Sequence, residues 1–142
     1  MKKHVYASLL ICGLIVGLAA SARAQSQIKV NVPFDFTIGN TLVQAGQYMV
    51  LPASASLGSE VLLFRDSDGQ SRAVTMGIRV EPTMKASEPR LVFHRYGDRY
   101  FLWQIWLNSG DAGREIRPGS HERELAKEQT APQLVAVLAQ SR

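Results

Sequence analysis

Two of the three histidines in this sequence, the two that lie beyond the first 24 residues, have the widest chemical repertoire, because imidazole titrates near neutral pH and binds transition metals. His94 falls in the middle of an expected strand, and His121 falls at the start of an expected helix. A metal site would need both of them, together with a carboxylate such as Glu122 or Asp98. Their spacing is not that of metal ligands, so we expect no metal and no other cofactor. We interpret His94 as a hydrogen-bonded, half-buried packing residue.

Arginine and tyrosine residues around a Gly-Asp pair are the candidates for recognition. The stretch 90–108 holds two runs rich in aromatic and branched residues on either side of Gly97-Asp98, which predicts a β-hairpin with a two-residue turn. The candidate contacts for a ligand or partner lie at its tip and are Arg95, Tyr96, Arg99 and Tyr100. Aromatic and guanidinium groups there could hold a sugar, an anion or a protein. The alternative is a structural tip, in which arginine stacks on tyrosine across the strands with Asp98 as counter-ion.

Several common catalytic and nucleotide-binding signatures are missing from the chain. No G-x-S-x-G, phosphate-binding loop or dinucleotide-binding motif occurs. Glu122 and Glu124 point in different directions on a helix, so they cannot share a substrate. The segment 66–69 contains part of a calcium-loop pattern, but the outer ligand positions would be Phe64 and Thr75, which favours a turn. We therefore expect a non-enzymatic protein, and the alternative is a hydrolase assembled from distant residues.

The hairpin is expected to lie at the centre of the fold. Alternation away from the turn places His94 opposite Phe101 and Val92 opposite Trp103. Both faces then contain apolar residues, so both should be covered by other parts of the protein. Trp103 is accordingly expected to be largely buried.

Other segments supply further strands and one helix. Residues 27–37 alternate as a half-buried strand does, and Pro33 indicates an edge position or an outward-facing N–H position, because proline has no amide hydrogen. Residues 134–138 are apolar without alternation, which predicts a strand that is either buried on both sides or paired centrally. The run H-E-R-E-L-A-K-E predicts a short helix with Ser120 as its N-cap and Glu122 in the first turn, where the helix dipole favours a carboxylate.

These elements predict an all-β fold, in the form of a small antiparallel β-sandwich or barrel of seven to eight strands with one short C-terminal helix. The strand spacing does not distinguish the sandwich from the barrel. Residues 25–142 hold no repeat, low-complexity segment or second domain, so we expect one β-rich domain with its own core.

The first 24 residues are typical of a signal peptide. Lys2 and Lys3 precede an uncharged run over 5–22, and residues 22–24 place alanines at the two positions that a signal peptidase reads. We expect cleavage after Ala24 and a protein that is exported, either periplasmic or extracellular. The signal peptide would then be its only membrane contact, before cleavage. An uncleaved anchor is the competing interpretation, because about 18 uncharged residues can just span a bilayer.

Cleavage would change the charge and the chemistry of the chain. The full sequence has 16 basic and 12 acidic residues, and Lys2, Lys3 and Arg23 leave with the signal, so 13 basic residues remain against 12 acidic ones. A net charge near zero argues against a nucleic-acid partner. The single cysteine, Cys12, also leaves, so the mature chain would have no disulfide and no thiol nucleophile.

Four segments resemble a known group of proteins. They are V-P-F-D-F-T-I-G-N (32–40), A-G-Q-Y-M-V (45–50), L-V-F-H-R-Y-G-D-R-Y-F-L (91–102) and G-R-E-I…S-H-E-R-E-L-A-K (113–127). With them the chain resembles an uncharacterised family of small secreted bacterial β-rich proteins of unknown function, over essentially its whole mature length. The resemblance implies export and a β-rich fold, and it assigns no functional residue.

The leading hypothesis is an exported, non-enzymatic β domain that acts as an envelope or extracellular binding or structural module, with an unknown protein or glycan partner. One alternative is a secreted hydrolase with dispersed catalytic residues. Another is a subunit of a surface assembly that pairs through an edge strand near Val32 and Pro33. A pocket with a carboxylate near a histidine would favour the hydrolase, and an open, flat aromatic patch would favour the binding module.

Overall fold

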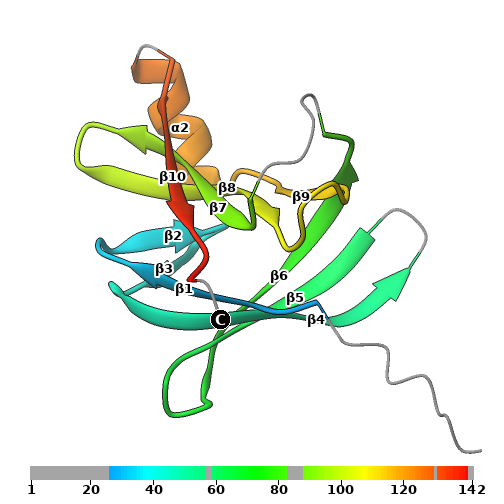
Figure 1. Ribbon diagram of the computed structural model, residues 1–142. Coiled ribbons are helices and arrows are strands. Elements are labelled where there is room, and N and C mark those ends of the chain that lie inside the picture. Colours follow the sequence, from blue (N-terminus) through cyan, green and yellow to red (C-terminus); the bar gives the residue numbers. More distant parts are fainter. Residues whose placement is uncertain (1–25, 57–58, 83–87, 130, 141–142) are drawn as a thin grey trace, which may run out of the picture.

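The computed structural model describes residues 26–56, 59–82, 88–129 and 131–140, so the expected signal peptide lies outside the described residues. The described part of the chain forms ten strands and one helix (Figure 1). They are β1 (Ile28–Val32), β2 (Phe36–Ile38), β3 (Thr41–Val43), β4 (Gly46–Ser56), β5 (Ser59–Arg65), β6 (Ser71–Val80), β7 (Arg90–Tyr96), β8 (Arg99–Trp106), β9 (Gly113–Ile116), α2 (Ser120–Glu128) and β10 (Gln133–Leu138). The predicted β-rich class with one short C-terminal helix is confirmed.

All ten strands belong to one open mixed sheet. Its order is β1-β4-β5-β6-β9-β8-β2-β3, and β7 pairs with both β8 and β10. Every pair is antiparallel except β2 with β8, which is parallel. The predicted number of seven to eight strands was therefore wrong, and the prediction of a fully antiparallel sheet was wrong for the pair of β2 and β8. Neither a sandwich nor a closed barrel is confirmed.

One of the extra strands and the parallel pair arise where the expected strand 27–37 breaks. Pro33 cannot donate a hydrogen bond to a neighbouring strand, so the ladder of β1 ends at Val32. The carboxylate of Asp35 accepts a hydrogen bond from the backbone N–H of Ala45 at 2.7 Å, which fixes the bend. Residues 36–38 then run beside β8 as the separate strand β2.

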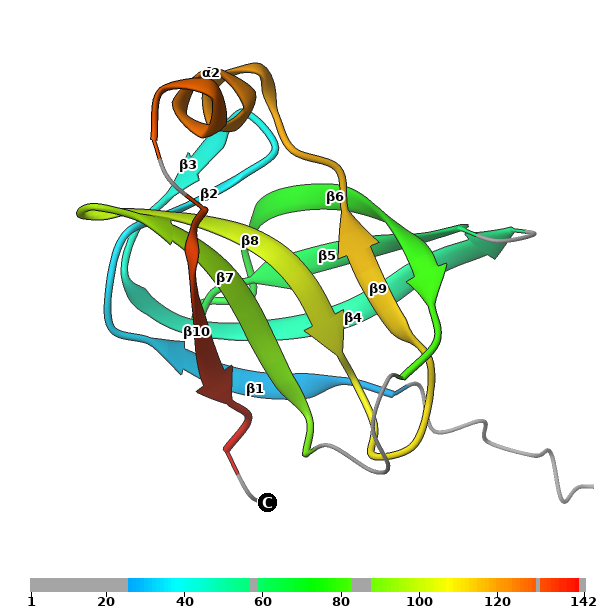
Figure 2. The ribbon, with the colours of Figure 1, turned by 90° about the horizontal axis from the view of Figure 1, so that it is seen from above.

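The sheet curves around a core that is rich in aromatic residues. In Figures 1 and 2, β7, β8 and β10 lie over β1 and β4, with the interior between them. Phe36 is central to this core, because its ring contacts the rings of Tyr48, Phe64 and Phe93 at centroid distances of 5.9, 6.4 and 5.3 Å. All four of these side chains are buried.

The two ends of the described chain meet at a seam between β1 and β10. Val30 forms an isolated antiparallel bridge with Ala139, and the N–H of Gln140 donates to the carbonyl of Lys29 at 2.8 Å. β1 pairs fully only with β4, at the end of the strand order, which agrees with the edge position that Pro33 indicates.

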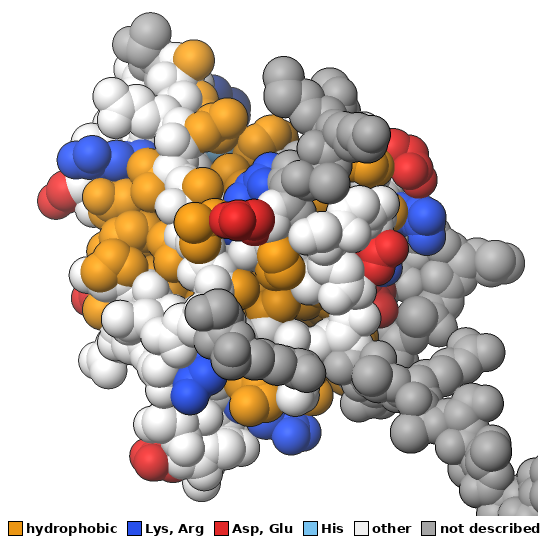
Figure 3. Space-filling view, in the orientation of Figure 1, with side chains coloured by type: hydrophobic (Ala, Val, Ile, Leu, Met, Phe, Trp, Pro, Cys, Tyr) orange, Lys and Arg blue, Asp and Glu red, His pale blue; other side chains and the backbone are white. Residues whose placement is uncertain are grey.

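β10 lies at an edge of the sheet and is largely exposed. It pairs only with β7, and Leu134 and Leu138 on its outer side are exposed, while Val135 and Val137 pack against the core. Both alternatives of the prediction, burial on both sides and central pairing, were wrong, because this apolar run lies at an edge and still has one face in solvent. Hydrophobic side chains gather on the surface around β7 and β10 (Figure 3).

The predicted hairpin is confirmed, with one change of register. Gly97 has φ 62°, as its place in the two-residue turn requires, and His94 lies opposite Phe101. A β-bulge near Trp103 then shifts the pairing, so that Val92 lies opposite Gln104 and not opposite Trp103.

The bulge decides which side chains enter the core. Ile105 joins Leu91 and Leu102 in the core cluster, although strict alternation would place Ile105 on the opposite face from both. Trp103 is half-buried and stacks on the ring of His94, with centroids 4.7 Å apart and an interplanar angle of 22°. The expected position of Trp103 opposite Val92 was wrong for this reason, and the side chain is only partly exposed.

The segment 66–69 is a turn, as predicted. The carboxylate of Asp66 accepts hydrogen bonds from the N–H groups of Asp68 and Gln70, and Gly69 has φ 77°. Arg72 forms an ion pair with Asp66. Burial acts to raise the pKa of Asp66, but the hydrogen bonds from Arg72 and the two backbone N–H groups outweigh it, and the pKa is lowered.

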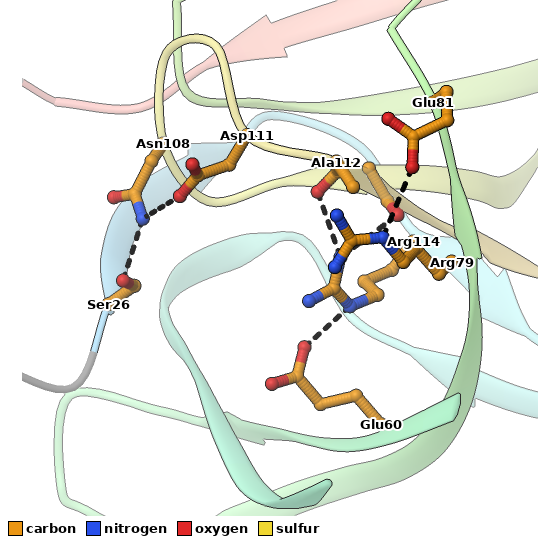
Figure 4. A network of polar contacts seen from close by, with 9 residues as sticks. Ser26, Glu60, Arg79, Glu81, Asn108, Asp111, Ala112 and Arg114 are labelled. Atoms are coloured by element: carbon orange, nitrogen blue, oxygen red, sulfur yellow. Dashed lines mark hydrogen bonds and ion pairs between the residues drawn. The ribbon is translucent and has the colours of Figure 1, made fainter. Parts of the chain in front are cut away.

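A polar network lies at one end of the sheet (Figure 4). Arg114 of β9 donates to Glu60 of β5 at 2.6 Å and to the carbonyl of Ala112 at 2.8 Å, and both charged side chains are mostly buried. Gly77 makes room for this pair, because a Cβ at that position would lie 2.7 Å from the Cβ of Arg114. An ion pair and hydrogen bonds therefore stabilise this end of the sheet, whereas apolar packing stabilises the core.

Candidate functional site

The hairpin tip separates the four candidate residues into two pairs. Arg99 and Tyr100 line a pocket of about 500 Å³ on one side of the tip. Arg95 and Tyr96 line a second pocket of about 550 Å³, together with the end of α2. The structure therefore does not bring the four residues together as one contact surface.

Three segments that are distant in sequence form the first pocket, which we call the tip pocket. They are the β2–β3 region, the hairpin tip and the first residues of α2, and Figure 2 shows β2, β3 and α2 on the same side of the molecule. The polar lining residues are Asp35, Thr37, Asn40, Asp98, Arg99, Tyr100, Ser120 and His121. Leu42 contributes an exposed apolar side chain to the wall. Such a mixture of converging polar groups and some apolar surface is typical of small-molecule sites.

The start of α2 is fastened to the turn between β2 and β3. The side-chain oxygen of Asn40 accepts hydrogen bonds from the N–H and the hydroxyl of Ser120, at 3.0 and 3.1 Å. Gly119 packs so closely here that a Cβ would lie 2.0 Å from the carbonyl oxygen of Gly39. The N-cap is Gly119, without a side-chain hydrogen bond, so the prediction of Ser120 as N-cap was wrong: its hydroxyl binds Asn40 instead.

A second contact holds α2 against the outer side of the hairpin. The carboxylate of Glu122 is buried and accepts a hydrogen bond from Nδ1 of His94 at 2.7 Å. His94 is therefore a half-buried, hydrogen-bonded packing residue, as predicted. Tyr96 lies nearby and is also buried, and burial, together with the negative charge of Glu122, raises the pKa of its hydroxyl.

Arginine and histidine form a hydrogen-bonded pair in the wall of the tip pocket. Nη1 of Arg99 lies 2.9 Å from Nε2 of His121. A guanidinium group can only donate, so Nε2 of His121 is the acceptor in this contact. The lining also holds two carboxylates, Asp35 and Asp98, against the one guanidinium of Arg99. The pocket is suited to a neutral or weakly cationic ligand rather than to an anion.

The ring of Tyr100 already makes two stacking contacts within the protein. Phe34 stacks on it with centroids 3.7 Å apart and an interplanar angle of 12°, and the guanidinium of Arg95 lies 5.5 Å from its centroid. This is the arginine-on-tyrosine stacking that the structural interpretation of the tip predicted. Arg95 also donates to the carbonyl of Gly97 at 2.7 Å, so it is committed to the hairpin itself.

Asp35, Asn40, Ser120 and His121 were not predicted as site residues. Of these four residues, only His121 stands out in the sequence, and it was considered there as a possible metal ligand. Among the described residues no group of three or more His, Cys, Asp or Glu side chains could hold a metal ion. The other three lie in a turn and at a helix start, and only the folded chain brings them to Arg99.

Comparison of the chain with protein-family models, with curated proteins and with solved structures finds no match. No helix in the described part of the chain is long and apolar enough to cross a membrane.

Proposed function

We propose that this protein is an exported, non-enzymatic β domain that binds a glycan in the tip pocket. The observation that carries the proposal is the convergence of two carboxylates, an amide, an arginine–histidine pair and hydroxyl groups on one pocket. Export rests on the features of residues 1–24 and implies a mature chain that begins at Gln25.

The lining suits neighbouring hydroxyl groups of a sugar. Carboxylate oxygens accept hydrogen bonds, while guanidinium and amide N–H groups donate them, so planar groups such as Asp98 and Arg99 can engage a hydroxyl in either role. The side-chain oxygen of Asn40 accepts both hydrogen bonds from Ser120, so the NH₂ group of Asn40 is the donor that it presents to the pocket. A polyhydroxylated ligand with little charge matches this balance better than a phosphate does, because two carboxylates would repel an anion.

Binding can be tested by calorimetry with polysaccharide fractions from the cell envelope of the producing organism. Arg99→Ala should reduce affinity at least about tenfold, since one charge-assisted hydrogen bond is worth about 1.5–3 kcal/mol. Arg123→Ala is the matched control, because Arg123 is exposed on the same helix as His121 and does not line the pocket. Equal loss of binding in both variants, or none in either, would contradict the proposal.

A hydrolase is the second candidate, because the tip pocket holds two carboxylates and a histidine. The described contacts pair His121 with Arg99 and not with a carboxylate, and the His94–Glu122 pair does not line the pocket. Release of new reducing ends from a bound polysaccharide, lost in Asp98→Asn, would establish hydrolysis and overturn the non-enzymatic proposal.

A further inference from the structure

The outer face of β4, β5 and β6 is apolar, although it points away from the core. Inward-facing residues of these strands, such as Val50, Leu62 and Phe64, fill the core. The outward-facing set, which we call the outer patch, consists of Met49, Leu51, Val61, Leu63, Val74, Met76 and Ile78. Val74 and Met76 are its most exposed members, at 61% and 59%. A sheet face of this kind marks a contact surface.

Cross-strand pairing makes the outer patch continuous. Leu51, Leu63 and Val74 lie opposite one another across three strands, and Val61 lies opposite Met76. Opposed residues in antiparallel strands have Cβ atoms about 5 Å apart, so these side chains touch across the face.

The outer patch has opposite charges at its two ends. At one end Lys29, Met49 and Arg65 are aligned across β1, β4 and β5, and neither cation has an ion-pair partner among the described residues. At the other end Glu115 of β9 lies beside Ile78, and its carboxylate receives a 3.4 Å hydrogen bond from Gln104.

We infer that the outer patch binds a second copy of this chain, face to face about a two-fold axis. Arg65 lies on β5 at the level of Ser71, and Glu115 lies on β9 at the level of Ile78. The point midway between them therefore falls on β6, between Val74 and Met76. A two-fold axis through that point, in the plane of the interface and perpendicular to the line from Arg65 to Glu115, sets Arg65 of each copy against Glu115 of the other.

The resulting dimer would bury its apolar centre and pair the charges at its rim. Two sheets packed face to face are the ordinary arrangement of β-sandwich cores, so the pairing requires no change of backbone. An anionic membrane would attract Lys29 and Arg65 but repel Glu115. Strand addition at the β1 edge would leave the patch uncovered.

The mass in solution tests this inference. Light scattering across a concentration series of the purified mature protein should approach twice the chain mass. Val74→Lys combined with Met76→Lys should give the monomer mass, because two ammonium groups would have to be buried. Leu134→Lys is the matched control, since Leu134 is 62% exposed on a different edge, and it should remain dimeric. If the lysine pair fails to fold by circular dichroism, Val74→Thr with Met76→Gln replaces it.

A charge exchange tests the symmetry. Arg65→Glu alone and Glu115→Arg alone should each weaken the dimer about tenfold or more, because each brings like charges together, and the two changes combined should restore it. A monomeric wild type at every concentration would overturn the inference. So would a dimer that survives the Val74 and Met76 changes, or a monomer that binds vesicles of anionic lipid through this patch.

Discussion

The burial of Glu122 is not what its position in the first turn of a helix suggests. A glutamate in the first turn of a helix is usually explained by the helix dipole, yet this carboxylate is buried against His94 and Tyr96. Nothing in the local pattern distinguishes it from Glu124, two residues later, which is exposed. The distinction depends on the hairpin that lies beneath the helix.

We expect Glu122→Ala to lower the free energy of unfolding by about 2–3 kcal/mol, because it leaves His94 without the acceptor for its buried Nδ1–H. Urea denaturation followed by fluorescence measures the change. Glu124→Ala on the same helix should cost less than about 0.5 kcal/mol, as exposed positions do. Equal effects of the two substitutions would show that the buried hydrogen bond adds nothing to stability.

Tyr96 should make the protein sensitive to alkaline pH. Burial, followed by the charge of Glu122, raises its folded pKa, so the folded state keeps the proton that the unfolded chain loses above about pH 10. Its contribution to stability is complete below that pH and is lost as the pH rises through the folded pKa. In Tyr96→Phe the free energy of unfolding should fall less steeply above pH 10. An unchanged slope would contradict this account, although Tyr48, whose pKa is also raised, should leave some slope in both proteins.

At the scale of elements, tight contacts hold α2 where it forms a wall of the tip pocket. Gly119→Ala should lower the free energy of unfolding by about 1–3 kcal/mol, as overpacking does, because its Cβ would overlap the carbonyl of Gly39. The same variant should also weaken glycan binding, since Ser120 and His121 would shift with the helix. Ser120→Ala serves as comparison, because it removes one exposed hydrogen bond without a clash. A Gly119→Ala protein with wild-type stability would show that the helix start is not tightly packed.

Elements with local signals were predicted correctly, and elements set by distant partners were not. The Gly97-Asp98 turn and the Asp66 turn are specified by their own residues, so the sequence was sufficient for both. The bulge near Trp103 and the exposure of β10 depend on which strands lie alongside, and a single sequence carries no record of that. The tip pocket is the extreme case, because Asn40 and Ser120 are 80 positions apart.

At the scale of the whole molecule, the seam between β1 and β10 depends on the last described residues. A chain that ends at Leu138 would lose the Val30–Ala139 bridge and the Gln140–Lys29 hydrogen bond. We expect a loss of about 1–3 kcal/mol in the free energy of unfolding, for one or two net hydrogen bonds and their flanking contacts. Backbone amides of β1 should exchange with solvent faster in this variant, while those of β5 and β6 should not. Uniform acceleration in every strand would indicate global destabilisation instead.

The seam also sets an order of events during synthesis. A ribosome delivers Val30 109 positions before Ala139, so β1 must wait for that whole segment before its second neighbour exists. Until then the aromatic interior stays open along one side, and in that interval a nascent chain is most exposed to aggregation and to proteases. Under the proposed export, a fold whose first strand gains its second neighbour only from residues 139–140 would stay open until that segment has been synthesised.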